Sequence, residues 1–193
     1  MTKTEIKKAS FHYFATKGYP STTMQEIAET VGIKKPSLYV HFKNKSDIYI
    51  AVLNDQYQCL FSAISKIDVA DDRIQFEARL KNLFFGIIDY LKDKDKFLFW
   101  KRTALMITED IEEEIAGKVT DTMRNLDNVI INKISDCVKM DLDTENLSAA
   151  TSYFMLLILG ILDYIFIFNI NNRISIEKVW FYLWNGYREL IKH

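Results

Sequence analysis

The stretch TMQEIAETVGIKKPSLYVHF, residues 23 to 42, carries the strongest structural signal in this chain. Its first four residues form a capping box, in which the hydroxyl of Thr23 and the carboxylate of Glu26 satisfy free backbone N–H groups where a helix begins. Gly32 is expected to end that helix, and Pro36 suits the first turn of the next one because its missing N–H is no loss there. The stretch therefore predicts two short helices joined by a glycine turn, which is the helix-turn-helix motif.

The second helix of this motif, expected over residues 35 to 42, has an apolar side and a polar side. Leu38 and Phe42 are four residues apart and are expected to face the core. The other side combines lysines with polar rings, which suits the phosphates of DNA, because a helix-turn-helix presents its second helix to the major groove. A structural role is also open, since Tyr39 can be a half-buried packed ring and His41 a core histidine bonded to a carbonyl.

The charge distribution supports a polyanion as the partner of the N-terminal segment. Residues 1 to 53 hold eight lysines against four acidic residues, whereas the formal net charge of the whole chain is −1. The remainder of the chain is therefore acidic. This asymmetry is expected when only one end of a protein approaches nucleic acid or an anionic membrane.

Residues 6 to 48 resemble the DNA-binding domain of TetR-family transcriptional regulators. The matching positions are Ile6, Ala9, Phe14, Gly18, Tyr19, Thr22, Thr23, Ile27, Ala28, Gly32, Ile33, Leu38, Tyr39, His41, Phe42, Lys45 and Ile48. The resemblance implies phosphate contacts from Tyr39, His41 and Lys45, and it implies that the start of the second motif helix faces bases. The residues predicted to contact double-stranded DNA are Thr23, Gln25, Lys34, Lys35, Pro36, Ser37, Tyr39, His41 and Lys45. The two lysines that open the second helix are more cationic than the small polar residues usual there, so no base preference is implied.

The rest of the chain also has helical periodicity, and its 2 prolines and 6 glycines allow long helices. We expect an all-α protein of about nine helices. A three-helix, helix-turn-helix DNA-binding domain would occupy residues 1–46, and a helical bundle for ligand binding and dimerisation would occupy residues 47–193. The expected helices are residues 3–17, 23–32, 35–42, 44–66, 72–92, 95–106, 110–138, 146–169 and 175–192.

The last two helices are the expected homodimer interface. A single helix-turn-helix covers little DNA, whereas two-fold dimers pair half-sites about 34 to 36 Å apart on a two-fold operator. Residues 146–169 are apolar on every face, which fits a helix buried on both sides, and dimers of the resembled family are built from their last helices. The residues predicted at the interface are Phe154, Leu157, Ile161, Tyr164, Val179, Trp180, Leu183 and Tyr187.

The middle helices are rich in aromatic residues, which form a core more often than a pocket. The resembled family holds an inducer between these helices, which implies an apolar or aromatic small-molecule effector. The residues predicted to line its pocket are Tyr57, Phe84, Phe85, Asp89, Phe99, Trp100, Arg102 and Met106. An effector wedged against the fourth helix would tilt a lever about 33 Å long. This tilt would change the distance between the two DNA-binding domains of a dimer.

Other functional classes have less support in the sequence. The three histidines fall at no metal or catalytic-triad spacing and there is no glycine-rich phosphate loop, so we expect neither an enzyme nor a cofactor. Cys59 and Cys137 match no metal spacing and are expected to be reduced thiols in a cytoplasmic protein without a secretory signal. Residues 153–168 are too few for a membrane span and contain Asp163, so no membrane is expected.

Two alternatives stay open. A structural protein of the same fold could coat chromosomal DNA without sensing a small molecule, and a filled body would favour it over a sensor with a pocket. The basic N-terminal segment could instead bind lipid, in which case vesicles would outcompete duplex DNA. The favoured interpretation is a ligand-responsive transcriptional regulator. The resemblance implies repression, because members of the resembled family repress more often than they activate.

Overall fold

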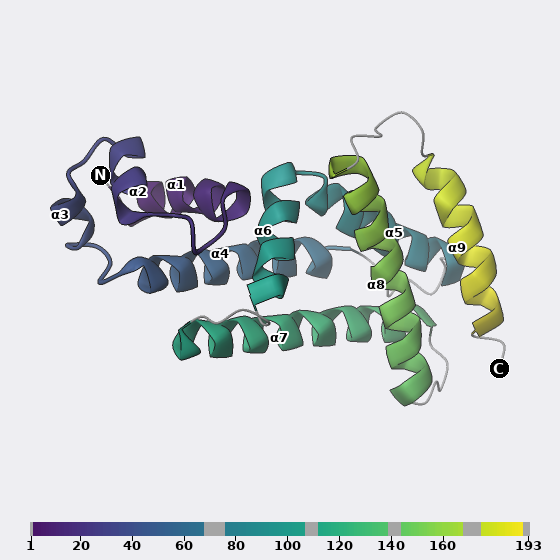
Figure 1. Ribbon diagram of the computed structural model, residues 1–193. Helices are drawn as coiled ribbons and strands as arrows, with labels where there is room; N and C mark the ends of the chain where they lie inside the picture. Colours follow the sequence, from purple (N-terminus) through teal and green to yellow (C-terminus); the bar gives the residue numbers. More distant parts are fainter. Residues whose placement is uncertain (1, 68–75, 107–111, 139–143, 168–174, 191–193) are drawn as a thin grey trace. The chain divides into compact units, whose positions relative to one another are not determined.

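The structure, a computed structural model, describes residues 2–67, 76–106, 112–138, 144–167 and 175–190. These residues form nine α-helices and no strand, which confirms the predicted all-α fold (Figure 1). The helices are α1 (Lys3–Thr16), α2 (Met24–Thr30), α3 (Lys35–Leu38), α4 (Lys45–Ser65), α5 (Phe76–Leu91), α6 (Lys94–Leu105), α7 (Glu113–Val138), α8 (Thr144–Phe166) and α9 (Ile176–Leu190). Predicted helix residues that lie outside the described part are 72–75, 110–111, 168–169 and 191–192.

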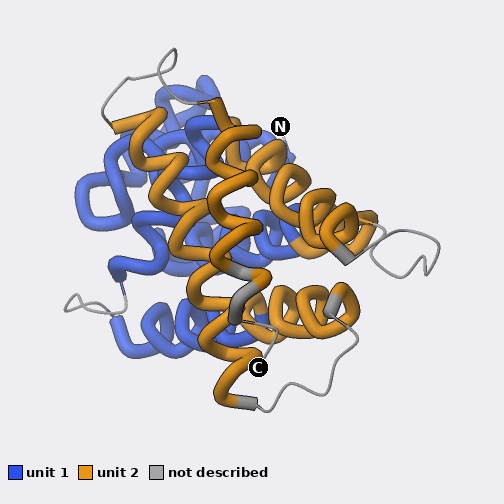
Figure 2. The backbone as a smooth tube through the Cα atoms, turned by 90° about the vertical axis from the view of Figure 1, so that its right-hand side faces the viewer, with its two compact units in different colours: residues 1–60, 93–125 blue, residues 61–92, 126–193 orange. Residues whose placement is uncertain are grey.

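The chain groups into two compact units (Figure 2). The first contains residues 1–60 and 93–125, and the second contains residues 61–92 and 126–193. Helices α4 and α7 each contribute residues to both units. The predicted boundary after residue 46 divides the chain by function, into a DNA-binding domain and a domain for ligand binding and dimerisation. This boundary stays a prediction.

Helix caps and glycine turns shape the N-terminal segment of the first unit. The hydroxyl of Thr23 accepts a hydrogen bond from the backbone N–H of Glu26 at 3.2 Å, and the Glu26 carboxylate accepts one from the Thr23 N–H at 2.9 Å. The predicted capping box is therefore confirmed, and α1 begins with an equivalent box. Gly18 and Gly32 follow α1 and α2 with φ of 83° and 72°, left-handed values that favour glycine at a helix end.

Helix α3 is held in place by the two side chains predicted to face inward. Leu38 and Phe42 are both buried, which confirms the prediction. The backbone N–H of Phe42 donates to the Leu38 carbonyl at 3.0 Å, so the helical turn continues beyond α3 to residue 42. Other buried apolar residues of this three-helix segment include Ile6, Phe14, Ile27 and Ala28. The rest of the 35–42 segment is left on the surface.

Helix α6 packs along α1 within the first unit. The ring centroids of Phe11 on α1 and Phe99 on α6 are 5.4 Å apart. The hydroxyl groups of Tyr49 on α4 and Thr103 on α6 share a buried hydrogen bond of 2.9 Å. These contacts hold α6 against α1 and α4, the helices on either side of the helix-turn-helix motif.

In the second unit, α5 packs against α8, and α8 packs against α9. The Phe84 ring on α5 contacts Phe154 on α8 and Trp180 on α9, with ring centroids 5.8 and 5.3 Å apart. All three residues are buried. Aromatic pairs at these separations add specific geometry to the apolar area that they bury, so this cluster fixes the packing of the three helices.

The C-terminal end of α4 is also held within the second unit. The ammonium group of Lys133 on α7 donates to the carbonyls of Ser65 and Ile67 at 3.4 and 3.0 Å. Gly86 of α5 lies so close to Ile67 that a Cβ atom at residue 86 would stand 2.5 Å from Ile67 Cδ1. Any larger residue at position 86 would therefore have to displace the Ile67 side chain at the end of α4.

Helix α8 is long and apolar enough to cross a membrane by length and composition alone, a test that core helices of soluble proteins also pass. Its core side within the unit carries the buried residues Phe154, Ile158, Ile161 and Leu162. Its other side exposes Leu156, Leu159 and Tyr164. Within one chain, α8 is therefore covered on one side and open on the other.

Candidate nucleic-acid interface

The start of α3 presents a cationic surface. Lys34 is the N-cap residue and its side chain makes no capping hydrogen bond, and Lys35, Pro36 and Ser37 are exposed. Within the described residues, no ion pair involves Lys34, Lys35 or the exposed Lys43. Three ammonium groups without a carboxylate partner can therefore meet phosphate oxygens from outside the protein.

The two polar rings that follow α3 lie at its surface. Tyr39 is 49% exposed, and His41 is less exposed but not buried. The backbone N–H groups of Tyr39 and His41 donate to the carbonyls of Pro36 and Leu38 at 3.2 and 2.9 Å, which fixes both side chains on one helical turn. Both rings are placed so that they can contact a partner at this surface.

The two predicted residues on α2 already have partners in the protein. The hydroxyl of Thr23 also donates to the Glu26 carboxylate at 2.8 Å, and the Gln25 side-chain amide donates to Glu29 at 2.6 Å. The Lys17 ammonium lies 2.5 Å from Glu26 and is the main cause that lowers the pKa of Glu26 to about 2, with Thr23 adding to the effect. Thr23 therefore has a clear capping role beside its predicted DNA contact.

Lys45 is turned toward the protein. Its ammonium group donates to the carbonyls of Tyr19 and Pro20 at 2.7 and 3.2 Å, and it lies 4.2 Å from the centroid of the Tyr19 ring. Burial lowers the pKa of Lys45. In this arrangement Lys45 orders the loop between α1 and α2, so a phosphate contact would have to share or replace these two hydrogen bonds.

The sequence reasoning missed two features of this surface. Val40 is 82% exposed, although it is apolar and belongs to the segment predicted to face DNA. The helical period set by Leu38 and Phe42 could have placed it on the outer side. The Tyr19 hydroxyl donates to the Glu112 carboxylate at 2.9 Å, and no sequence pattern pairs residues 93 positions apart. Burial and this hydrogen bond raise the pKa of Tyr19.

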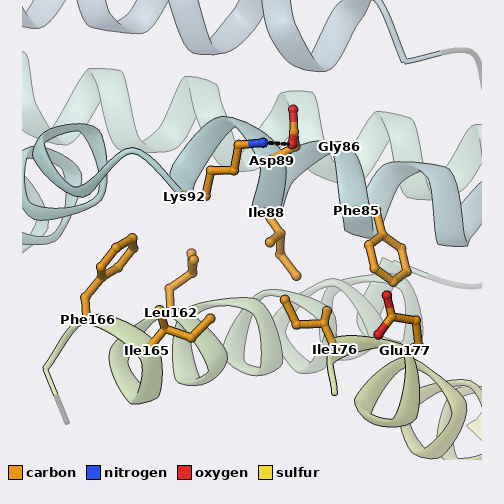
Figure 3. A pocket seen from close by; sticks show the side chains of 10 residues that line it. All are labelled: Phe85, Gly86, Ile88, Asp89, Lys92, Leu162, Ile165, Phe166, Ile176 and Glu177. Atoms are coloured by element: carbon orange, nitrogen blue, oxygen red, sulfur yellow. Dashed lines mark hydrogen bonds and ion pairs between the residues drawn. The ribbon is translucent and has the colours of Figure 1, made fainter. Parts of the chain in front are cut away.

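A second candidate site is a groove of about 850 Å³ in the second unit, between α5, α8 and the start of α9 (Figure 3). Its apolar lining consists of Phe85, Gly86, Ile88, Leu162, Ile165, Phe166 and Ile176. Figure 3 shows Lys92 and Asp89 as an ion pair on α5, and Glu177 beside Phe85 at the other end of the groove. The groove thus combines an apolar wall with charged ends.

The residues predicted to line an effector pocket lie in different places. Phe85 and Asp89 line this groove, whereas Phe84 is buried against Phe154 and Trp180. In the first unit, Phe99, Trp100 and Met106 are buried. Tyr57 lines a small polar groove between α4 and α7, and Arg102 donates to backbone carbonyls at the end of α1.

The residues predicted at a dimer interface also divide. Phe154, Ile161, Trp180 and Leu183 are buried within their own chain. Leu157 and Val179 are partly exposed, Tyr164 is exposed, and the side chain of Tyr187 lies outside the described part. The exposed large apolar residues of α8 and α9 are Leu156, Leu159, Tyr164, Phe181 and Tyr182, and we refer to them together as the open face of α8 and α9.

Comparison with known proteins agrees with the geometry of α1 to α4. A family model described as bacterial regulatory proteins, tetR family, matches residues 6–52. The HTH-type transcriptional regulator YuxN of Bacillus subtilis is 32% identical over 110 residues, which are 56% of this chain and 37% of YuxN. The biofilm operon icaADBC negative transcriptional regulator IcaR of Staphylococcus aureus is 27% identical over 125 residues, 64% of each protein. This chain spans less than two thirds of the length of either relative.

Solved structures share the fold over nearly the whole chain. The transcriptional regulator FadR of Bacillus subtilis, solved in complex with stearoyl-CoA, has a TM-score of 0.69 and covers 98% of this chain and 97% of its own. The two sequences are 17% identical. At this sequence identity, the similarity shows a shared fold only.

Proposed function

Because this chain belongs to the tetR family of bacterial regulatory proteins, we propose that it represses transcription as a homodimer and leaves its two-fold operator when a small apolar effector binds. The observation that carries the proposal is the exposed, cationic start of α3 beside Tyr39. We propose the cytoplasm as its location, and the regulators that it resembles support a role in binding rather than in catalysis.

The homodimer is proposed from the open face of α8 and α9. Phe181 and Tyr182 are 60% and 72% exposed on α9, and Leu156 and Leu159 are exposed on α8. Exposed apolar surface of this kind marks interaction sites, and a two-fold interface brings the same patch of both chains together. Tyr164 belongs both to this face and to the residue set expected from the sequence, and the rest of that set stays a prediction.

The effector site is proposed in the groove of the second unit. Its apolar wall can cover a chain or ring system, and the charged groups at its ends can meet a polar terminus. FadR, which shares this fold, was solved with stearoyl-CoA, so acyl compounds are the first probes. A groove of this size supports a sensor over the alternative of a protein that only coats chromosomal DNA.

Helix α4 is the proposed route from effector to DNA. Its last turn is held in the second unit by Lys133, and its first turns carry Ile48 and Tyr49 in the buried core of the first unit. A ligand shifts such an equilibrium only through unequal affinity for the two states, typically about 1 to 3 kcal/mol of coupling. The effector must therefore bind the operator-free form more tightly.

The test begins with the full chain and a randomised duplex library, from which bound sequences are selected and measured by fluorescence anisotropy. We expect a two-fold site, bound by a dimer, and lower transcription from a promoter that contains it. Stearoyl-CoA and stearate are then titrated into the complex and should release the DNA. Ile165→Trp, which fills the groove, should keep DNA affinity and abolish release, whereas Glu145→Trp, on the exposed start of α8, should change neither.

Three outcomes contradict parts of this proposal. Binding without sequence preference, together with no release by either probe, would favour the chromosome-coating alternative. Release that is unchanged by Ile165→Trp would move the effector site away from the groove. Anionic vesicles that outcompete every duplex would replace DNA by lipid as the partner.

A further inference from the structure

Val40 is placed where it contributes little to folding. It is 82% exposed, the largest exposed fraction among the exposed large apolar side chains of the described residues. The core positions of the same segment are already filled by Leu38 and Phe42, which are buried. A β-branched side chain so far out of the core gains almost no burial in the free protein. Its contribution is therefore expected in a complex.

The helical geometry places Val40 together with Pro36. The hydrogen bond from the Phe42 N–H to the Leu38 carbonyl keeps this segment in a helical turn, and each residue of a helix advances by about 100°. Pro36 and Val40, four residues apart, therefore share one line along the segment, roughly opposite Leu38 and Phe42. Both are exposed, so the helical period places them as an apolar ridge on the outer side of the segment 35–42.

The surroundings of this ridge are cationic or polar. Lys34 and Lys35 precede it, Ser37 and Tyr39 flank it, and all four are exposed. Phosphate contacts made by such groups fix the register of a protein on a duplex but carry no sequence information. An apolar ridge between them has one apolar target in the major groove, because thymine alone among the four bases presents a methyl group there.

We propose that Pro36 and Val40 pack on a thymine C5-methyl group, and that Val40 thereby determines a preference for thymine at one position of each half-site. This rests on the proposed function, because it requires that α3 enters the major groove. Val40 is thus a specificity-determining residue, whereas the lysines beside it supply affinity for any sequence.

The experiment removes the methyl groups of one side of the contact at a time: those of the base, and those of Val40. Thymines of the selected duplex are replaced singly by deoxyuridine, which keeps base pairing and lacks only the methyl group. We expect one thymine per half-site at which deoxyuridine weakens binding about fourfold, the value of about one buried methyl-sized group. Val40→Ala should weaken binding to the thymine duplex and be insensitive to deoxyuridine at that position, so the two changes should not add.

Two controls separate this contact from folding and from charge. Val40→Ala should unfold at the same temperature as the unaltered protein because the side chain is exposed. Lys34→Ala should weaken binding to the thymine and deoxyuridine duplexes by the same factor. A cytosine placed at the critical position should also bind more tightly when it is 5-methylated, and Val40→Ala should lose that difference.

The outcomes distinguish the two proposals. If deoxyuridine weakens binding of Val40→Ala as much as binding of the unaltered protein at every thymine, the ridge proposal is overturned while sequence-specific binding stands. If no duplex is selected above random DNA, the proposed function fails, and the ridge fails with it. A fourfold loss at one thymine that disappears in Val40→Ala supports both.

Discussion

Arg102 and Ala15 are joined by a hydrogen bond of 2.9 Å from the guanidinium Nε to the backbone carbonyl at the end of α1. A second bond runs from Arg102 Nη2 to the carbonyl of Thr16 at 3.0 Å. The last carbonyls of a helix lack partners within it and carry partial negative charge. Arg102 satisfies two of them from α6 and so connects two helices that are distant in sequence.

Replacing this guanidinium should destabilise the first unit. We expect Arg102→Ala to lower the free energy of unfolding by about 1 to 3 kcal/mol, because two charge-assisted hydrogen bonds to a helix end are lost. Urea denaturation measures the change. Arg124→Ala is the matched control, since Arg124 only pairs with Asp121 on an exposed face of α7, and its effect should stay below about 0.5 kcal/mol. Equal effects of the two variants would refute the capping role.

Lys45→Ala separates a structural role from a phosphate contact. In the structure, the Lys45 ammonium donates hydrogen bonds to the carbonyls of Tyr19 and Pro20. Because these bonds are lost, we expect the variant to lower the free energy of unfolding by about 1 kcal/mol. DNA affinity should fall while the slope of affinity against salt stays unchanged. Lys34→Ala should instead leave stability intact and reduce that slope by about 0.9. A reduced slope for Lys45→Ala at full stability would restore its predicted phosphate contact.

Acid should weaken the contact between α1 and α2. The Lys17 ammonium and the capping box hold the pKa of Glu26 at about 2, below its ordinary value of 4.5. A carboxyl group with a lowered pKa in the folded state stabilises the fold above the unfolded-state value, and this contribution is lost as pH falls from about 4.5 toward 2. Glu26→Gln should therefore remove part of the pH dependence of the unfolding temperature between these values. Glu145→Gln, which changes an exposed carboxylate on α8, should leave the profile intact.

The two cysteines should differ in reactivity. Burial raises the pKa of the Cys137 thiol to about 12, whereas Cys59 is exposed. Because the thiolate is the reactive form, a disulfide reagent at pH 8 should modify one thiol of the native protein and two after denaturation. Cys59→Ser should abolish the reaction of the native protein. Rapid modification of that variant would mean that the end of α7 opens readily.

A charge on the open face of α9 should separate the proposed dimer. Phe181→Glu adds a carboxylate to a side chain that is 60% exposed in the single chain, so the fold should survive while two buried carboxylates would face each other across a two-fold interface. Light scattering after gel filtration should report a monomer. Lys178→Glu, exposed on the same helix, should remain dimeric. If both variants remain dimeric, this face is not the dimer interface.

Local signals made much of the fold predictable. Capping residues and glycines marked helix ends, because their backbone chemistry acts within a few residues, and the four-residue spacing of Leu38 and Phe42 gave the orientation of α3. Side-chain partners were less accessible to this reasoning. Arg102 was predicted to line an effector pocket, but the carbonyls that it binds lie 87 and 86 residues away, and no local pattern encodes that distance.

Helix α8 shows a second limit of periodicity. It is apolar almost all round, so the hydrophobic pattern cannot choose which side faces the core. Phe154 and Ile161 were predicted at an interface between chains and are buried within their own chain, whereas Leu156 and Leu159 are exposed. Which side of α8 is buried depends on the helices that pack against it in the folded chain.

A single carbon atom added at Gly86 would affect two parts of the structure. Gly86 lines the groove of the second unit and also touches Ile67 just beyond the end of α4. An alanine there must either displace Ile67 or bend α5, so a single methyl group would perturb the groove wall and the end of α4 together. At this junction the size of residue 86, rather than its chemistry, determines how α5 and the end of α4 fit together.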